Sequence, residues 1–138
     1  MTRRLTVLVA DDEAIFLKVL TARLTDEGYE VLPVTNQDEL ATKAPEADAL
    51  VVDARLPSEK LEGLEVVASL FQPSPRIGPD TPILFISVHA ETDDAIRDKL
   101  KQLPALAGRY RWLQKPFETD LLVELLRDAL AQPGEETS

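Results

Sequence analysis

The sequence predicts an α/β fold, a doubly wound sheet of five parallel strands with helices on both faces, and three features support this prediction. Short apolar runs alternate along the chain with longer segments of helical periodicity. The runs lack polar alternation, which is typical of parallel strands buried between two helical layers. The chain has 138 residues and no cysteine, so we expect one domain whose core forms without disulfides or thiolate metal sites.

The first strand–helix pair is predicted at 5–10 and 13–27, and Gly28 follows where a helix commonly ends. The helical segment carries apolar residues at steps of four, with two more beside them: Phe16, Leu20 and Leu24, flanked by Ile15 and Val19. This pattern indicates an amphipathic helix.

The second and third pairs are shorter. A strand at 29–34 precedes Asn36 and Glu39, whose spacing resembles a capping box that opens a short helix. A further strand is predicted at 49–52 and a helix at 63–71. The apolar stripe of this helix has three members: Leu64, Val67 and Leu70.

The fourth and fifth pairs complete the sheet. Strands are predicted at 83–86 and 110–114, and helices at 93–103 and 119–131. The residues of these helices expected to face inward are apolar: Ile96, Leu100, Leu122, Leu125, Leu126 and Leu130.

The extent and charge of the domain limit what it can bind. The domain is expected to span 1–131, with 132–138 as a polar tail or the start of a linker. The formal net charge of −10 would repel nucleic-acid phosphates and anionic membranes, so we expect neither as a partner. No segment approaches membrane-spanning length and no cleavable signal is recognised, so a cytoplasmic location is expected.

Residues suited to chemistry gather where the predicted strands end, which is where open parallel sheets bind ligands. Asp11 and Asp12 follow the first strand, Asp53 the third, Ser87 the fourth and Lys115 the fifth. Three carboxylates held close repel one another and favour a hard cation such as Mg²⁺. An aspartate can attack phosphorus, and an ammonium and a hydroxyl can hold phosphoryl oxygens, so the set predicts phosphoryl transfer.

Taken singly, these residues have simpler explanations. Asp11 and Asp12 also suit the positive end of the following helix dipole. Ser87 suits a turn, and Lys115 a solvated surface. The joint occurrence of five such groups at four strand ends favours the functional interpretation.

Four segments together resemble the receiver domain of response regulators in two-component signalling. They are Val7–Glu13, Val51–Pro57 with Gly63, Ile83–Ser87 and Lys115–Phe117. Their order makes the match specific, and it extends from Leu5 to Ala131. The resemblance implies a flavodoxin-like fold with strand order 2-1-3-4-5.

By this resemblance, Asp53 would be the phosphoacceptor. Mg²⁺ would be bound by Asp53, by Asp12 directly and by Asp11 largely through water. The backbone carbonyl of Arg55 would be a further ligand.

The resemblance also implies how the signal enters and leaves. Ser87 would bind the phosphoryl group and shift toward it, and Lys115, joined to Pro116 by a cis bond, would pair with a phosphoryl oxygen. The donor would be a histidine kinase or a phosphotransfer protein. A downstream protein or output domain would bind the face made by the fourth helix, fifth strand and fifth helix. The chain would be a switch that turns over no metabolite, and the sequence neither requires nor excludes a homodimer.

Two features depart from the family pattern in ways that affect output. Trp112 stands where the family carries a switch aromatic, and its larger indole, whose N–H only donates, would either swing or stay fixed. The connections at 71–82 and 91–109 are longer than is usual in the family. They would form either a particular partner surface or tolerated slack.

A third feature borders the site. Arg55 and His89 each lie two residues beyond a predicted site residue, Asp53 and Ser87. They would either tune the lifetime of the phosphoryl group or be ordinary exposed polar residues.

Two other functions are compatible with the same fold. A pseudo-receiver would be a constitutive protein-interaction module, and Trp112 with the long connections leaves it open. A phosphatase of the haloacid dehalogenase type would carry Asp-x-Asp after its strand. Arg55 stands at the second of these positions, so the phosphatase is disfavoured.

Overall fold

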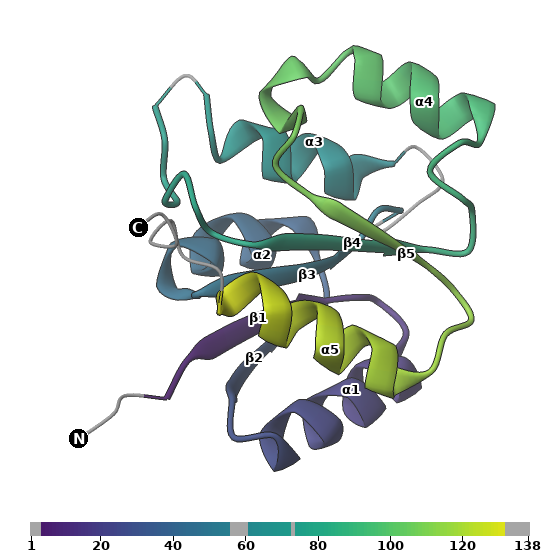
Figure 1. The fold of residues 1–138 in the computed structure, drawn as a ribbon. Helices are drawn as coiled ribbons and strands as arrows, with labels where there is room; N and C mark the ends of the chain where they lie inside the picture. The colour runs from purple at the N-terminus through teal and green to yellow at the C-terminus, as the bar shows by residue number, and fades with distance from the viewer. Residues whose placement is uncertain (1–3, 56–60, 73, 132–138) are drawn as a thin grey trace.

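The computed structural model describes residues 4–55, 61–72 and 74–131. These residues form a five-stranded parallel sheet in the order β2-β1-β3-β4-β5, which confirms the predicted fold class and strand order (Figure 1). Pro57, part of the motif used above, and the expected tail at 132–138 lie outside the described residues.

The elements alternate along the chain as predicted. The strands are β1 (Thr6–Ala10), β2 (Glu30–Val34), β3 (Ala49–Asp53), β4 (Ile83–Ser87) and β5 (Arg111–Gln114). The α-helices are α1 (Ala14–Asp26), α2 (Gln37–Lys43), α3 (Glu62–Ser69), α4 (Asp94–Lys101) and α5 (Thr119–Leu130). Two short 3₁₀ turns, η1 (Ala44–Glu46) and η2 (Pro104–Leu106), were not predicted.

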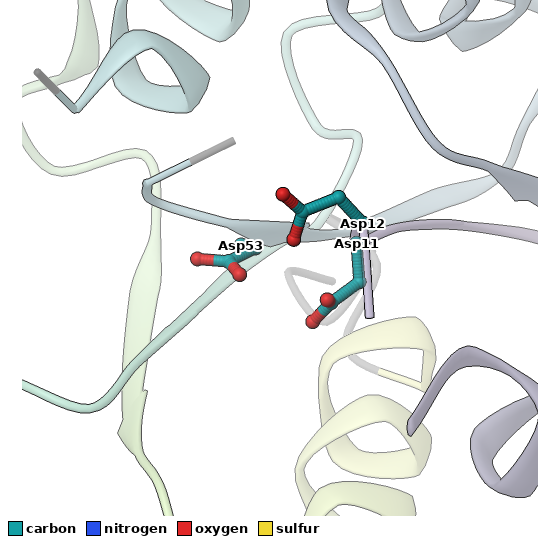
Figure 2. A group of neighbouring side chains, drawn as sticks. All are labelled: Asp11, Asp12 and Asp53. Carbon is teal, nitrogen blue, oxygen red and sulfur yellow. The ribbon is translucent and has the colours of Figure 1, made fainter. Parts of the chain in front are cut away.

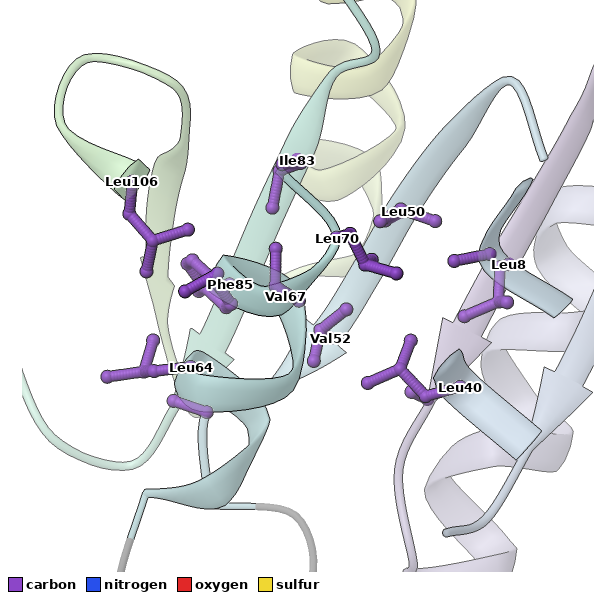
Figure 3. Packing of buried hydrophobic residues seen from close by; sticks show 14 of the residues in the cluster. Leu8, Leu40, Leu50, Val52, Leu64, Val67, Leu70, Ile83, Phe85 and Leu106 are labelled. Carbon is purple, nitrogen blue, oxygen red and sulfur yellow. The ribbon is translucent and has the colours of Figure 1, made fainter. Parts of the chain in front are cut away.

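The sheet is the middle of three layers, with α1 and α5 on one face and α2, α3 and α4 on the other (Figure 1). Strand side chains alternate between two apolar clusters, because successive residues of a strand point to opposite faces. Leu8, Val52 and Phe85 point to the α3 side, where Figure 3 shows them packed beneath helix residues. Val51 and Ile86 point to the α1 and α5 side.

The buried face of α1 differs from the prediction. Leu17, Leu20 and Leu24 are buried, whereas Phe16 is half-buried and Ile15 and Val19 are exposed. Steps of four residues drift by about 40° each around a helix of 3.6 residues per turn. The steps of three and four from Leu17 stay in register with the core, so Leu20 and Leu24 are buried as predicted, and Leu17 in place of Phe16 completes the buried stripe.

The start of α2 matches the predicted capping box only in part. The Asn36 side chain accepts a hydrogen bond from the Glu39 N–H, as expected. The Glu39 carboxylate, however, accepts from the Thr35 N–H and not from that of Asn36. One unpaired N–H of the first turn is therefore capped, and the second bond of the box is displaced by one residue.

The two long connections contribute to the core. Ile77 in one and Leu106 in the other are buried in the cluster beneath α3. Pro104 stands in η2, and α4 ends at Lys101, before the predicted boundary. Both connections therefore contribute side chains to the hydrophobic core and are not merely tolerated surface loops. Within the described part of the chain, no helix has the length and apolar character needed to cross a bilayer.

Candidate functional site

Three aspartates meet at the carboxyl edge of the sheet because β1 and β3 are neighbours. Ala10 pairs with Val52, so the residues that follow emerge side by side. Asp11, Asp12 and Asp53 each place a carboxylate oxygen within 4.8 Å of the others, and Figure 2 shows the three side chains converging. The sequence placed these residues at one edge, and the structure brings them into one cluster.

Each of two carboxylates is held by a backbone N–H two residues along the chain. The Glu13 N–H donates to Asp11 Oδ1 at 2.8 Å, and the Arg55 N–H donates to Asp53 Oδ1 at 2.9 Å. Such local bonds fix the carboxylates without help from other elements. They occupy one oxygen of each and leave the Oδ2 atoms directed at shared partners.

Lys115 is one such partner. Its Nζ lies 3.1 Å from Asp11 Oδ2 and 3.6 Å from Asp53 Oδ2, with Glu13 Oε1 at 3.5 Å. The same ammonium lies 4.3 Å from the centre of the Phe16 ring, a cation–π contact. The Lys115–Pro116 bond is cis, as the family resemblance predicted.

The pKa of Asp11 reflects crowding. Burial raises the pKa of this fully enclosed carboxyl, and the Asp53 charge adds to the rise. The Glu13 N–H and the Lys115 ammonium act in the opposite direction, yet the net pKa lies above its ordinary value. Ionised Asp11 is therefore only partly compensated by its protein neighbours.

The pKa of Lys115 is also raised. Burial lowers the pKa of the ammonium, but the charges of Asp53, Asp11 and Glu13 together outweigh it and raise the pKa overall. The Lys115 ammonium contacts Asp11, Asp53 and Glu13, and Asp12 adds a further carboxylate to the cluster, so the carboxylates of this group outnumber its ammonium. The Asp12 side chain is exposed, which leaves the cluster open to solvent.

This donor set fits Mg²⁺. Carboxylates are hard oxygen donors, and the described cluster offers three of them, where Mg²⁺ sites commonly use one or two together with waters. Burial is the main cause of the raised Asp11 pKa, and a divalent cation would offset the smaller contribution from the Asp53 charge. The residues that would hold it are Asp11, Asp12 and Asp53, which the structure brings together, and the Arg55 carbonyl stays a prediction from the family resemblance.

Ser87 and His89 border the acidic cluster on the β4 side. Ser87 is buried at the end of β4, whose neighbour β3 ends at Asp53. The Ser87 hydroxyl oxygen accepts from the His89 N–H at 3.0 Å. The His89 Nε2 lies 3.2 Å from Arg55 Nη1, so these two predicted neighbours of the site contact each other.

Trp112 lies on β5, beside this group and away from the acidic cluster. Its half-buried indole donates from Nε1 to the backbone carbonyl of His89 at 2.9 Å. The ring also packs near Phe85, with 5.9 Å between centroids. The aromatic is thus connected to the loop that follows Ser87.

Some residues that shape the site were not assigned a role from the sequence. Gly63 in α3 lies so close to β3 that a methyl group there would overlap the carbonyl oxygen of Asp53. Phe16 and Glu13 complete the surroundings of Lys115. The sequence identifies Gly63 only as part of a motif, because the close approach of two backbones leaves no pattern in a single sequence.

The comparisons with known proteins agree with this geometry. The family model of the response regulator receiver domain matches residues 7–127. The chain belongs to the response regulator receiver family. It is therefore a two-component signalling domain with the fold of a receiver.

Among characterised relatives, this receiver is similar to part of larger regulators. The DNA-binding transcriptional regulator NtrC of Rhizobium meliloti is 33% identical over 133 residues, which are 93% of this chain and 24% of that protein. The transcriptional regulatory protein GlrR of Escherichia coli is 26% identical, over 95% of this chain and 27% of that protein. The receiver thus spans about a quarter of the length of these relatives.

Solved structures show the same fold. The chemotaxis response regulator CheY4 of Vibrio cholerae superposes with a TM-score of 0.71 at 26% identity, covering 92% of this chain and 99% of that one. A CheY-like receiver domain protein of Methanospirillum hungatei reaches 0.75 at 22% identity, covering 97% of this chain and 99% of that one.

Proposed function

We propose that this receiver is a phosphorylation-controlled switch that accepts a phosphoryl group on Asp53 in the presence of Mg²⁺ and thereby controls the binding of a partner. The donor is a phosphohistidine on a histidine kinase or phosphotransfer protein. The observation that supports this proposal most is the convergence of Asp11, Asp12 and Asp53, with Lys115 Nζ directed at two of them.

The chemistry follows from the roles that these side chains can perform. An Asp53 Oδ atom attacks phosphorus, the phosphorus–nitrogen bond of the phosphohistidine breaks, and its electron pair stays on the imidazole. When bound, Mg²⁺ supplies charge neutralisation and orientation of the phosphoryl oxygens. Lys115, held beside Asp53, supplies a positive charge to another phosphoryl oxygen, and the Ser87 hydroxyl donates to a third.

The output side is proposed to be the face made by α4, β5 and α5. Trp112 on β5 contacts the loop that follows Ser87, which provides a route from the site to this face. A downstream protein or an output domain would bind there. The relatives include transcriptional regulators, but the partner of this receiver is defined only as a protein surface complementary to that face.

The test uses a small phosphodonor. Purified protein with Mg²⁺ and acetyl phosphate should gain the mass of one phosphoryl group, and Asp53→Asn should gain none. The Trp112 fluorescence should respond to beryllofluoride, because this is the single tryptophan of the chain and its loop contact adjoins Ser87.

The outcomes separate the competing functions. No phosphoprotein and no fluorescence response would favour a pseudo-receiver that binds its partner constitutively. Sustained release of phosphate from a substrate at high turnover would favour a phosphatase. A stable single phosphorylation that Asp53→Asn removes supports the switch.

Arg55 and His89 are proposed to set how long the phosphoryl group persists. Their side chains contact each other across the loops that follow β3 and β4, beside the acceptor. Such a pair restricts the approach of water to Asp53. Arg55→Ala and His89→Ala should each change the dephosphorylation rate, and unchanged rates in both would end this part of the proposal.

A further inference from the structure

We propose that an apolar groove beside Asp53 binds the acyl group of small acyl phosphates, so that the receiver prefers donors with a longer apolar acyl chain to acetyl phosphate. This inference rests on the proposed function, because Asp53 is the phosphoacceptor there, and it adds a class of small donor. The groove lies between the start of α1, the loop that follows β4 and the connection from β5 to α5, and its volume is about 920 Å³.

The first step concerns the apolar character of the groove. Among the described residues, seven of the ten that line it are apolar, so its walls suit a ligand with an apolar part. Ile15 is 80% exposed, and Val19 and Val88 are each 51% exposed. The rings of Phe16 and Phe117, edge to face with 5.9 Å between centroids, line the same groove. Apolar side chains gathered in the open in this way are typical of a binding site.

The second step concerns where the polar groups of the groove lie. Of its described lining residues, Glu13 and Lys115 carry charge, and Glu13 Oε1 lies 3.5 Å from Lys115 Nζ. The Thr119 hydroxyl oxygen accepts a hydrogen bond from Arg23 Nη1 at 3.3 Å. The two charges therefore lie together at the end next to the acidic cluster, and the rest of the groove suits an uncharged chain.

The third step connects the groove to the phosphoacceptor. Lys115 lines the groove, and its Nζ lies 3.6 Å from Asp53 Oδ2, so the groove begins one side chain away from the attacking group. When an Asp53 oxygen attacks an acyl phosphate, a bond forms from that oxygen to phosphorus, and the bond from phosphorus to the acyl oxygen breaks. The electron pair of the broken bond stays on the acyl oxygen, which leaves as a carboxylate without needing a proton. The chain attached to this leaving group can lie in the groove.

The test compares butyryl phosphate with acetyl phosphate as donors to the whole chain in the presence of Mg²⁺. The two donors release carboxylic acids of nearly equal strength, so the length of the acyl chain is the main difference between them. The second-order rate constant, followed as phosphoprotein by mass spectrometry, should be roughly three- to tenfold higher for butyryl phosphate, because two more CH₂ groups are partly removed from water. Hexanoyl phosphate should extend the trend.

Two variants test whether this preference comes from the groove. Val88→Thr keeps the size of the side chain but adds a hydroxyl, and Ile15→Thr also shortens it. Each should move the ratio of the butyryl to the acetyl rate constant toward one. Leu121→Thr is the matched control, because Leu121 is another exposed apolar residue but does not line the groove, and it should keep the wild-type ratio. A ratio measured on one protein is insensitive to a fraction that fails to fold.

The outcomes separate this inference from the function on which it rests. Equal rate constants for both donors in the wild type, or a wild-type ratio in both groove variants, would overturn the inference. Loss of the preference in Leu121→Thr as well would show that it does not depend on the groove. Wild-type protein that accepts a phosphoryl group from neither donor would instead defeat the proposed function.

Inhibition provides a second measurement that needs no transfer through the ligand. Hexylphosphonate and methylphosphonate share an anionic head that cannot be transferred, and they differ in their apolar chains. Hexylphosphonate should inhibit phosphorylation by acetyl phosphate at a roughly tenfold lower concentration, because its chain is partly buried in the groove. Val88→Thr should reduce this difference. Equal inhibition by the two compounds would contradict binding of the chain.

Discussion

The two halves of the carboxyl edge satisfy their polar groups in opposite ways. On the β1 and β3 half, Asp11, Asp12 and Asp53 form one cluster, Lys115 contacts two of them, and burial raises the pKa of Asp11. On the β4 and β5 half, Ser87 and Trp112 take part in neutral hydrogen bonds with the His89 backbone. The acidic half carries carboxylates that its ammonium only partly compensates, whereas the polar groups of the neutral half bond one another.

This difference indicates how the work of the site is divided. Repulsion among carboxylates lowers the stability of the folded protein and is relieved by a bound cation, so the acidic half is where ligand binding and folding are linked. Neutral hydrogen bonds lose little on desolvation and fix geometry. We therefore expect changes to the acidic half to alter Mg²⁺-dependent stability, and changes to the neutral half to alter rates.

The largest expected effect comes from disturbing the backbone under the acidic half. Gly63→Ala should lower the free energy of unfolding by about 2 kcal/mol or more, because the new methyl group would overlap the Asp53 carbonyl oxygen. Urea denaturation measures the change. Gly78→Ala is the matched control, because its methyl group would meet only the movable Thr81 hydroxyl. Equal stability of the two variants would contradict the close contact of α3 with β3.

The next effect distinguishes the two halves directly. Mg²⁺ at ten times its dissociation constant should stabilise the fold by about 1.4 kcal/mol through mass action. Asp12→Ala should remove most of this gain, and Ser87→Ala, on the neutral half, should keep it. Melting temperatures with and without Mg²⁺ provide the measurement. A wild-type melting curve that does not respond to Mg²⁺ would argue against the metal site.

A smaller effect is expected from pH in the absence of metal. Because the folded state raises the pKa of Asp11, it holds this proton more tightly than the unfolded chain does. The associated stability is present below the unfolded pKa and is lost as pH rises through the folded pKa. Metal-free protein should therefore lose this contribution on going from acid toward neutral pH, and Asp11→Asn should reduce the loss. The affinity for Mg²⁺ should instead rise from acid toward neutral pH, because protonation of Asp11 at acid pH weakens binding.

The smallest effect lies on the output side of the neutral half. Burial and the hydrogen bond to Glu91 raise the pKa of Tyr110 from its ordinary 10.0 to about 12. Between these values the unfolded chain loses the proton first, so stability should fall as pH rises. Tyr110→Phe should flatten this decline, as measured by denaturation across the alkaline range. The control is Tyr29→Phe, which should retain the loss of stability at alkaline pH that is due to Tyr110.

Several features could be read from the sequence because they depend on local patterns. Apolar runs and helical periodicity predicted the elements, and residues after the strand ends predicted Asp11, Asp53 and Lys115 as neighbours. Helix faces were harder to predict: Phe16 and Leu17 are adjacent apolar residues, and the structure buries Leu17 while Phe16 is half-buried.

The sequence by itself determined the order of elements and the residue types at the carboxyl edge, since both follow from patterns that are local to each strand and helix. Only the tertiary structure decided which oxygen of Asp11 faces Lys115, how closely Gly63 approaches β3, and that Trp112 bonds the His89 carbonyl. These contacts join residues from different elements. Their geometry depends on strand register and helix packing, which no single segment of the chain encodes.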